Sequence, residues 1–144
     1  MKFGTVTGAA LVLWCLCVAV QASKPAQTPT TNDGVYTKEQ AARAKKQYDA
    51  LCADCHAFSI AEKKRPRDLP LGDEPFFEQW TGRPLNQLVT VIHLTMPNDG
   101  SAEVSEAEAL DLVAYILQRN GFPAGSKPLT KATAAAVIER PKKK

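Results

Sequence analysis

The stretch Cys52-Ala53-Asp54-Cys55-His56 decides how the rest of the chain is interpreted. Two thiols three residues apart can form a disulfide, act as a thiol redox pair or attach a haem. The histidine after the second cysteine favours the third interpretation, because C-x-x-C-H is typical of c-type haem attachment. On one helical turn, Cys52 and Cys55 can each add to a vinyl group at one edge of the porphyrin, and His56 is placed to ligate the iron. We therefore expect one covalently bound haem c.

A thioredoxin-like dithiol and a structural zinc site are the alternatives for Cys52 and Cys55. The thioredoxin-like motif lies in an α/β sheet, whereas no segment of this chain shows the two-residue alternation of a strand. A structural zinc site needs a second pair of ligands, and His93 is the only other histidine. The sequence favours haem over both.

The N-terminus has the pattern of a secretory signal peptide at residues 1–22. Lys2 supplies a positive charge, residues 9–20 (AALVLWCLCVAV) are apolar, and cleavage is expected after Ala22. The alternative is a permanent membrane anchor, but the apolar run is shorter than the roughly 20 residues that span a bilayer. We therefore expect export to the periplasm. Cleavage also removes two of the four cysteines and leaves the pair of the motif.

Hydrophobic periodicity predicts three helices and no strand, and hence an all-α fold. The first helix begins at Thr37 with a T-x-x-Q capping box and runs into the cysteine motif. The second begins near Pro84 and stops before Pro97, because the residue before a proline is pushed out of the helical region. The third begins at Ser105 with another capping box and stops at Asn120-Gly121. The apolar stripes of the three helices are Ala41, Ala44, Tyr48 and Leu51; Leu85, Leu88, Val89 and Ile92; and Leu110, Val113, Ala114 and Leu117, broadened by Leu112, Tyr115 and Ile116.

The segments outside these helices set the predicted domain boundaries. Residues 23–34 are rich in Pro, Thr and Ser and predict a flexible leader. Residues 57–74 show no period, and so long a loop is unusual in a small domain unless it wraps something. Residues 126–144 predict a basic tail with at most a short helical turn at residues 132–139. One domain remains, at residues 35–125.

Met96 is the candidate for the second axial ligand of the iron, because it is the only methionine outside the predicted signal peptide. Pro97 forces an extended backbone at Met96, so the side chain is presented from a loop. Methionine commonly fills gaps in a core, but the position of Met96 after the haem motif favours ligation. His93 is the rival ligand and would give a bis-histidine haem with a lower reduction potential.

Composition and charge are those of an ordinary globular protein and exclude few classes of function. Hydrophobic residues make up 44% and charged residues 23% of the chain. The formal net charge of +3 is small and scattered, which argues against a nucleic-acid partner. Residues 63–67 (KKRPR) form a basic run that is either a docking patch for an acidic partner or a solvated loop. We expect no stable membrane insertion once the signal peptide has been removed.

Over residues 35–125 the chain resembles the class I monohaem cytochromes c, and it is most similar to cytochrome c subunits or domains that serve periplasmic dehydrogenases. The resemblance rests on the haem motif and on these matching positions: Ala44, Tyr48, residues 80–85 (WTGRPL), Met96-Pro97, Leu112, Tyr115 and residues 120–125 (NGFPAG). It implies N- and C-terminal helices that cross around one covalently bound haem. The chain departs from the family at Ala57-Phe58-Ser59, where glycine usually follows the haem histidine.

The resemblance also implies contacts around the haem. A proline carbonyl should accept a hydrogen bond from the other ring nitrogen of His56; Pro70 is the candidate and Pro66 the alternative. Apart from the resemblance, an indole N–H and a guanidinium are suited to donate to haem propionates, so Trp80 and Arg83 are candidates for that contact. Their alternative roles are a core tryptophan and a solvated arginine.

The function that follows is electron transport by a carrier that is not itself an enzyme. With both axial positions filled by His56 and Met96, no position is open for oxygen, peroxide or substrate. The expected partners are redox proteins: a periplasmic dehydrogenase as donor and a cytochrome or terminal oxidase as acceptor. The alternative is a haem sensor or peroxidase-like enzyme in which a ligand displaces Met96.

Overall fold

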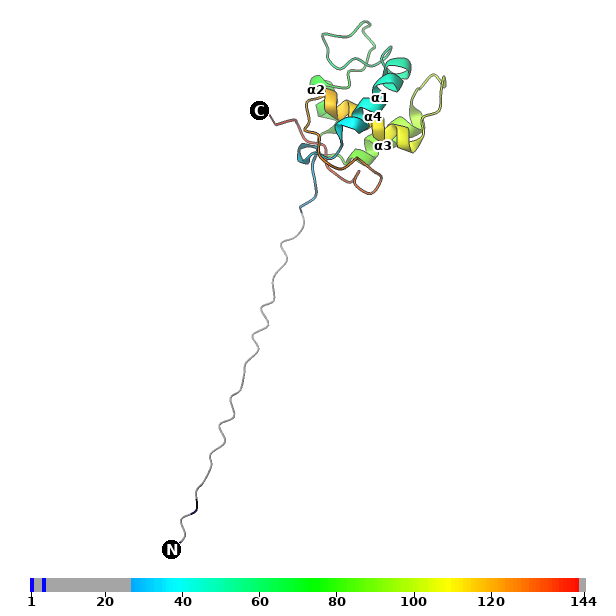
Figure 1. Cartoon of the computed structure of the whole chain (residues 1–144). Helices are drawn as coiled ribbons and strands as arrows, with labels where there is room; N and C mark the ends of the chain where they lie inside the picture. Colours follow the sequence, from blue (N-terminus) through cyan, green and yellow to red (C-terminus); the bar gives the residue numbers. More distant parts are fainter. Residues whose placement is uncertain (2–3, 5–26, 143–144) are drawn as a thin grey trace.

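The computed structural model describes Met1, Gly4 and residues 27–142, and the remainder of the predicted signal peptide lies outside the described residues (Figure 1). The described part is all-α, as expected, and contains two isolated β-bridges in place of any strand. Its elements in chain order are the 3-10 helix η1 (Thr31–Asp33) and the α-helices α1 (Lys38–Leu51), α2 (Asp73–Trp80), α3 (Leu85–Thr95) and α4 (Glu106–Arg119). None of the described helices is both long enough and apolar enough to cross a bilayer.

Helices α1 and α4 cross each other and form the most extensive helix pair (Figure 1). On α1 the buried face includes the small residues Ala41 and Ala44, which allow close approach of the two backbones. On α4 the buried face contains Leu112 and Tyr115, the two residues singled out by the family resemblance. The expected crossing of the N- and C-terminal helices is therefore confirmed.

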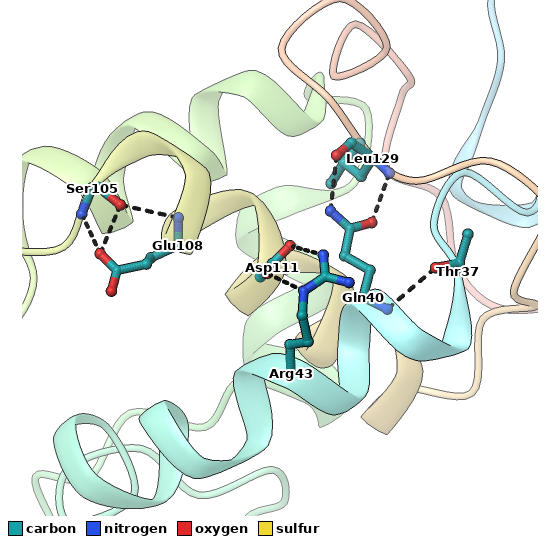
Figure 2. Close-up of polar contacts among 7 residues, drawn as sticks. All are labelled: Thr37, Gln40, Arg43, Ser105, Glu108, Asp111 and Leu129. Carbon is teal, nitrogen blue, oxygen red and sulfur yellow. Dashed lines mark hydrogen bonds and ion pairs between the residues drawn. The ribbon is translucent and has the colours of Figure 1, made fainter.

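The two predicted capping boxes have different outcomes. Ser105 and Glu108 form the complete reciprocal box at the start of α4 (Figure 2). At α1, the Thr37 hydroxyl accepts from the Gln40 backbone N–H at 3.2 Å, but the Gln40 side chain does not reach back. Instead, the Gln40 amide pairs with the backbone N–H and C=O of Leu129 at 2.7 and 2.8 Å (Figure 2).

Helix α2 was not predicted by the sequence. Its eight residues follow Pro70 and Gly72 and include Pro75, so breaker residues obscured the pattern of Phe76, Phe77 and Trp80, which α2 buries. Proline is tolerated in the first turn of a helix because the N–H that it lacks has no partner inside the helix. The expected loop at residues 57–74 therefore ends at Gly72.

The packed unit extends beyond residues 35–125 at both ends. Thr31, in the expected leader, is fully buried and its N–H donates to the carbonyl of Val137 at 2.9 Å. In the expected tail, the carbonyls of Ala134 and Ala136 accept from the first two backbone N–H groups of α3, at 2.8 and 2.9 Å. The tail thus caps α3, whose N-cap Pro84 provides no side-chain cap. The expected helical turn at residues 132–139 is a non-helical turn followed by extended chain.

Candidate functional site

Cys52, Cys55 and His56 lie on the turn that ends α1. Cys52 is the C-cap of the helix, and its carbonyl accepts from the N–H groups of Cys55 at 3.1 Å and His56 at 2.9 Å. The turn therefore carries the two thiols and the imidazole within five consecutive residues. Both thiols are free, with Cys52 half-buried and Cys55 exposed. Burial raises the pKa of the Cys52 thiol to about 11, and the nearby Cys55 adds to the shift.

His56 is oriented by a backbone carbonyl of the following loop. Its Nδ1 lies 2.9 Å from the carbonyl oxygen of Leu69. The expectation of Pro70, with Pro66 as the alternative, was therefore wrong by one residue: Pro70 directly follows Leu69 and favours the extended backbone that presents this carbonyl. Because a carbonyl oxygen only accepts, the proton of neutral His56 is on Nδ1, and Nε2 keeps its lone pair for a metal ion.

The same segment is tied back to the haem motif by two backbone hydrogen bonds. Leu69 N–H donates to the carbonyl of Cys55 at 3.1 Å, and Leu71 N–H donates to the carbonyl of Ala57 at 2.7 Å. Residues 69–71 therefore run beside residues 55–57. This pairing fixes the distance between the ring of His56 and the carbonyl of Leu69.

Asp68 organises the basic part of this loop and was not identified from the sequence. Its buried carboxylate accepts from the backbone N–H groups of Lys64 and Arg65 at 3.0 and 2.9 Å, and from the Arg65 side chain at 2.9 Å. Burial raises the pKa of Asp68, but the hydrogen bonds from Arg65 and Lys64 more than offset this, so the pKa lies below its ordinary value. The run KKRPR is thus partly neutralised, because Arg65 is paired with Asp68.

An aromatic cluster supports the motif from behind. The rings of Tyr48, Phe58 and Tyr115 lie 5.0 to 5.8 Å apart between centroids, and the Tyr48 hydroxyl donates to the carbonyl of His56. Phe58 is buried, and the Arg119 guanidinium lies 4.2 Å from its ring centroid. Tyr48 and Tyr115 match the aromatic positions of the family, whereas Phe58 lies where the chain departs from it. Phe58, which packs on α1 and α4, is one residue after the position where the family usually has glycine.

Met96 lies on a separate element, directly after α3. Its backbone has φ −118° and ψ 142°, the extended conformation predicted from Pro97, and its side chain is half-buried. No hydrogen bond among the described residues joins Met96 to Cys52, Cys55 or His56. The structure therefore groups three of the four predicted site residues and leaves ligation by Met96 a prediction.

The other predicted contact residues have clear positions. Trp80 is buried at the end of α2, and the guanidinium of exposed Arg83 lies 5.7 Å from its ring centroid. Their contact with haem propionates remains a prediction. His93, the rival ligand, is exposed on α3 with Nδ1 2.7 Å from the carbonyl oxygen of Val104.

The chemistry of the donor set fits a covalent haem better than a bare metal ion. Among the described residues, no group of three or more His, Cys, Asp and Glu side chains is arranged to hold a metal ion. Free thiols suit thioether formation with the haem vinyl groups, and one imidazole nitrogen with a lone pair suits haem iron. Leu69, whose carbonyl lies 2.9 Å from Nδ1 of His56, and Leu94, two residues before Met96, are 63% and 68% exposed and provide apolar surface of the kind that a macrocycle covers.

Comparison with known proteins gives a family for this arrangement. Residues 39–116, more than half of the chain, match the family model described as cytochrome C oxidase, cbb3-type, subunit III. No curated protein and no solved structure matches the chain. The matched region begins in α1, contains the haem motif and Met96, and ends in α4. The chain therefore belongs to this family, and its fold is that of a class I c-type cytochrome domain.

Proposed function

We propose that this chain is an exported monohaem cytochrome that carries single electrons from a periplasmic dehydrogenase to a downstream cytochrome or terminal oxidase. Its membership in a family of c-type cytochrome domains supports haem-based electron transfer. The observation that carries the proposal is the turn after α1, which bears two free thiols and an imidazole oriented by the carbonyl of Leu69.

Each site residue has a separate task in this proposal. Cys52 and Cys55 would hold the macrocycle through thioether bonds, and His56 would offer Nε2 while the carbonyl of Leu69 keeps Nδ1 occupied. Met96 offers its thioether sulfur from the loop after α3, which stabilises ferrous iron and raises the reduction potential relative to a second histidine. When bound, haem would supply a reversible one-electron couple.

A carrier role, as opposed to an enzymatic one, would require that His56 and Met96 both bind the iron. Electrons then pass without a bond to oxygen, peroxide or substrate. The alternative, a haem sensor or peroxidase-like enzyme, requires Met96 to leave the iron. Carbon monoxide binding to the reduced protein separates the two: slow or absent binding supports the carrier, and fast, complete binding contradicts it.

Export follows from the sequence of residues 1–22, and we propose cleavage after Ala22 and residence in the periplasm. N-terminal sequencing of the protein purified from its host tests this. A mature chain beginning at Ser23 supports the proposal, and an intact Met1 contradicts cleavage.

Ligation by Met96 is tested by two substitutions at the same position. Met96→Leu preserves size and removes the sulfur, so the oxidised protein should lose the weak iron–sulfur charge-transfer band at long wavelength and the reduced protein should bind carbon monoxide readily. Met96→His restores a ligand, so carbon monoxide binding should again be suppressed while the reduction potential falls. An unchanged band in Met96→Leu would show that another group ligates the iron.

A further inference from the structure

His93 connects α3 to the end of the loop that begins at Met96 and returns to the core at Val104. The side chain of His93 is on the exposed face of α3, and its Nδ1 lies 2.7 Å from the carbonyl oxygen of Val104. Val104 is 4% exposed and directly precedes Ser105, the N-cap of α4. One imidazole therefore bridges the last turns of α3 and the residue that anchors the end of the loop.

The loop between these anchors has few other attachments. Its internal hydrogen bonds are local: Gly100 N–H to the carbonyl of Pro97 at 3.1 Å, and Ser101 N–H to the carboxylate of Asp99 at 3.0 Å. Residues 98–101 are exposed. In the described part of the chain, the hydrogen bond of His93 is the only one that connects α3 to residues 97–104.

We propose that His93 is a positioning residue that closes this loop and thereby keeps the Met96 thioether at the iron. The inference rests on the proposed ligation by Met96. Met96 begins the loop that His93 closes, so the opening of the loop and the departure of the sulfur are coupled. Because a carbonyl only accepts, Nδ1 of His93 carries a proton, and both the neutral ring in this tautomer and the imidazolium form the contact.

The test measures how easily an added ligand replaces Met96. Exogenous imidazole is titrated into the oxidised holoprotein, and binding is followed through loss of the iron–sulfur charge-transfer band. His93→Leu removes the donor and should increase the apparent affinity for imidazole about fivefold, the factor that corresponds to the net contribution of one neutral hydrogen bond. His93→Asn keeps an N–H at the place of Nδ1 and should return the affinity towards that of the wild type.

Thr90→Ala is the matched control on the same helix. The hydroxyl of Thr90 donates to the carbonyl of Asn86 within α3 and forms no hydrogen bond with the described residues of the loop. The Thr90→Ala variant should therefore have the same affinity for imidazole as the wild type. The thermal midpoint is measured for all variants, because a general loss of stability would affect His93→Leu and His93→Asn alike, whereas a positioning role is rescued by asparagine.

The outcomes separate this inference from the proposed ligation. If the wild type shows the charge-transfer band but His93→Leu binds imidazole no more tightly than the wild type, only the role of His93 is overturned. If the wild type lacks the band and Met96→Leu leaves its spectrum unchanged, the ligation by Met96 is overturned, and the role of His93 with it. Nitrogen-15 chemical shifts of the unmodified protein provide a test without substitution: a proton on Nδ1 of His93 supports the contact with Val104, and a neutral ring protonated only on Nε2 refutes it.

Discussion

Gly72 is the position at which a single methyl group should disturb the orientation of His56. Its backbone has φ −149°, which any residue adopts, so alanine introduces no backbone strain. The added Cβ would lie 2.1 Å from the carbonyl oxygen of Phe58 and 2.9 Å from Oδ1 of Asn120. The first contact has to open from 2.1 Å to at least 3.0 Å, a movement of about 0.9 Å between the two segments.

That movement is large compared with the hydrogen bond it affects. Leu69 and Gly72 belong to the same short segment, and the carbonyl of Leu69 is 2.9 Å from Nδ1 of His56. A shift of about 0.9 Å away from the motif would break this bond, since hydrogen bonds weaken sharply beyond about 3.5 Å. Overpacking of this kind costs about 1–3 kcal/mol of folding free energy. We therefore expect Gly72→Ala to lower stability and to shift the reduction potential.

The assay is guanidinium unfolding of the holoprotein together with a potentiometric titration. Gly82→Ala is the control, because Gly82 has φ +84° and nothing within 4 Å of its Cβ position. Left-handed strain should cost this control about 1 kcal/mol and shift the potential less than Gly72→Ala does. A Gly72→Ala protein with the stability and potential of the wild type would refute the reasoning.

Three further predictions concern the helix pair and the motif. Gln40→Ala should lower the free energy of unfolding by about 1–3 kcal/mol, because it strands two buried backbone groups, whereas Arg43→Ala removes only an exposed ion pair and should have a several-fold smaller effect in the same denaturant assay. Burial raises the pKa of Tyr48. Stability should therefore be retained below pH about 10 and decline above it, where the unfolded phenol ionises, and Tyr48→Phe should show a smaller decline in alkaline denaturation curves. In the chain before haem attachment, exposed Cys55 should react with iodoacetamide faster than half-buried Cys52, whose thiol has a pKa raised to about 11; equal rates by mass spectrometry would contradict this.

The features that were predicted well depend on residues close together in the sequence. The motif Cys52–His56 depends on spacing alone, and the turn that gathers its side chains follows from the end of α1. The stripe Leu85, Leu88, Val89 and Ile92 recurs at helical spacing, and the structure confirms it. The capping box at Ser105 depends on two residues three positions apart, and the structure confirms it too. The extended backbone at Met96 was predictable for the same reason, because Pro97 acts on its immediate neighbour.

The features that were missed depend on long-range contacts. Gln40 satisfies the conditions for a capping box, but Leu129, far along the chain, competes for its side chain. The carbonyl that holds His56 belongs to Leu69 because of the register between residues 55–57 and 69–71, which no local pattern encodes. Asp68 acts through a loop conformation that it helps to create.

The packed C-terminal segment did leave a signal in the sequence. Ala136 and Ile138 are buried two residues apart, as expected for extended chain with one face on the core, and Ala134 is buried in the turn before them. Their small number and the lysines that follow suggested a tail instead. Since the segment provides backbone acceptors for α3, truncation of the chain before Ala134 would remove the cap of the helix that carries Met96.

The central claim is that Cys52 and Cys55 hold one haem covalently, and the most direct test is the intact mass of the purified protein after extraction with acidified organic solvent. We predict that the mass equals that of the mature chain plus one haem, that the colour stays with the protein, and that the Cys52→Ser, Cys55→Ser double variant releases its haem into the solvent. A wild-type protein that loses its haem to the solvent and has the mass of the chain alone would contradict the account.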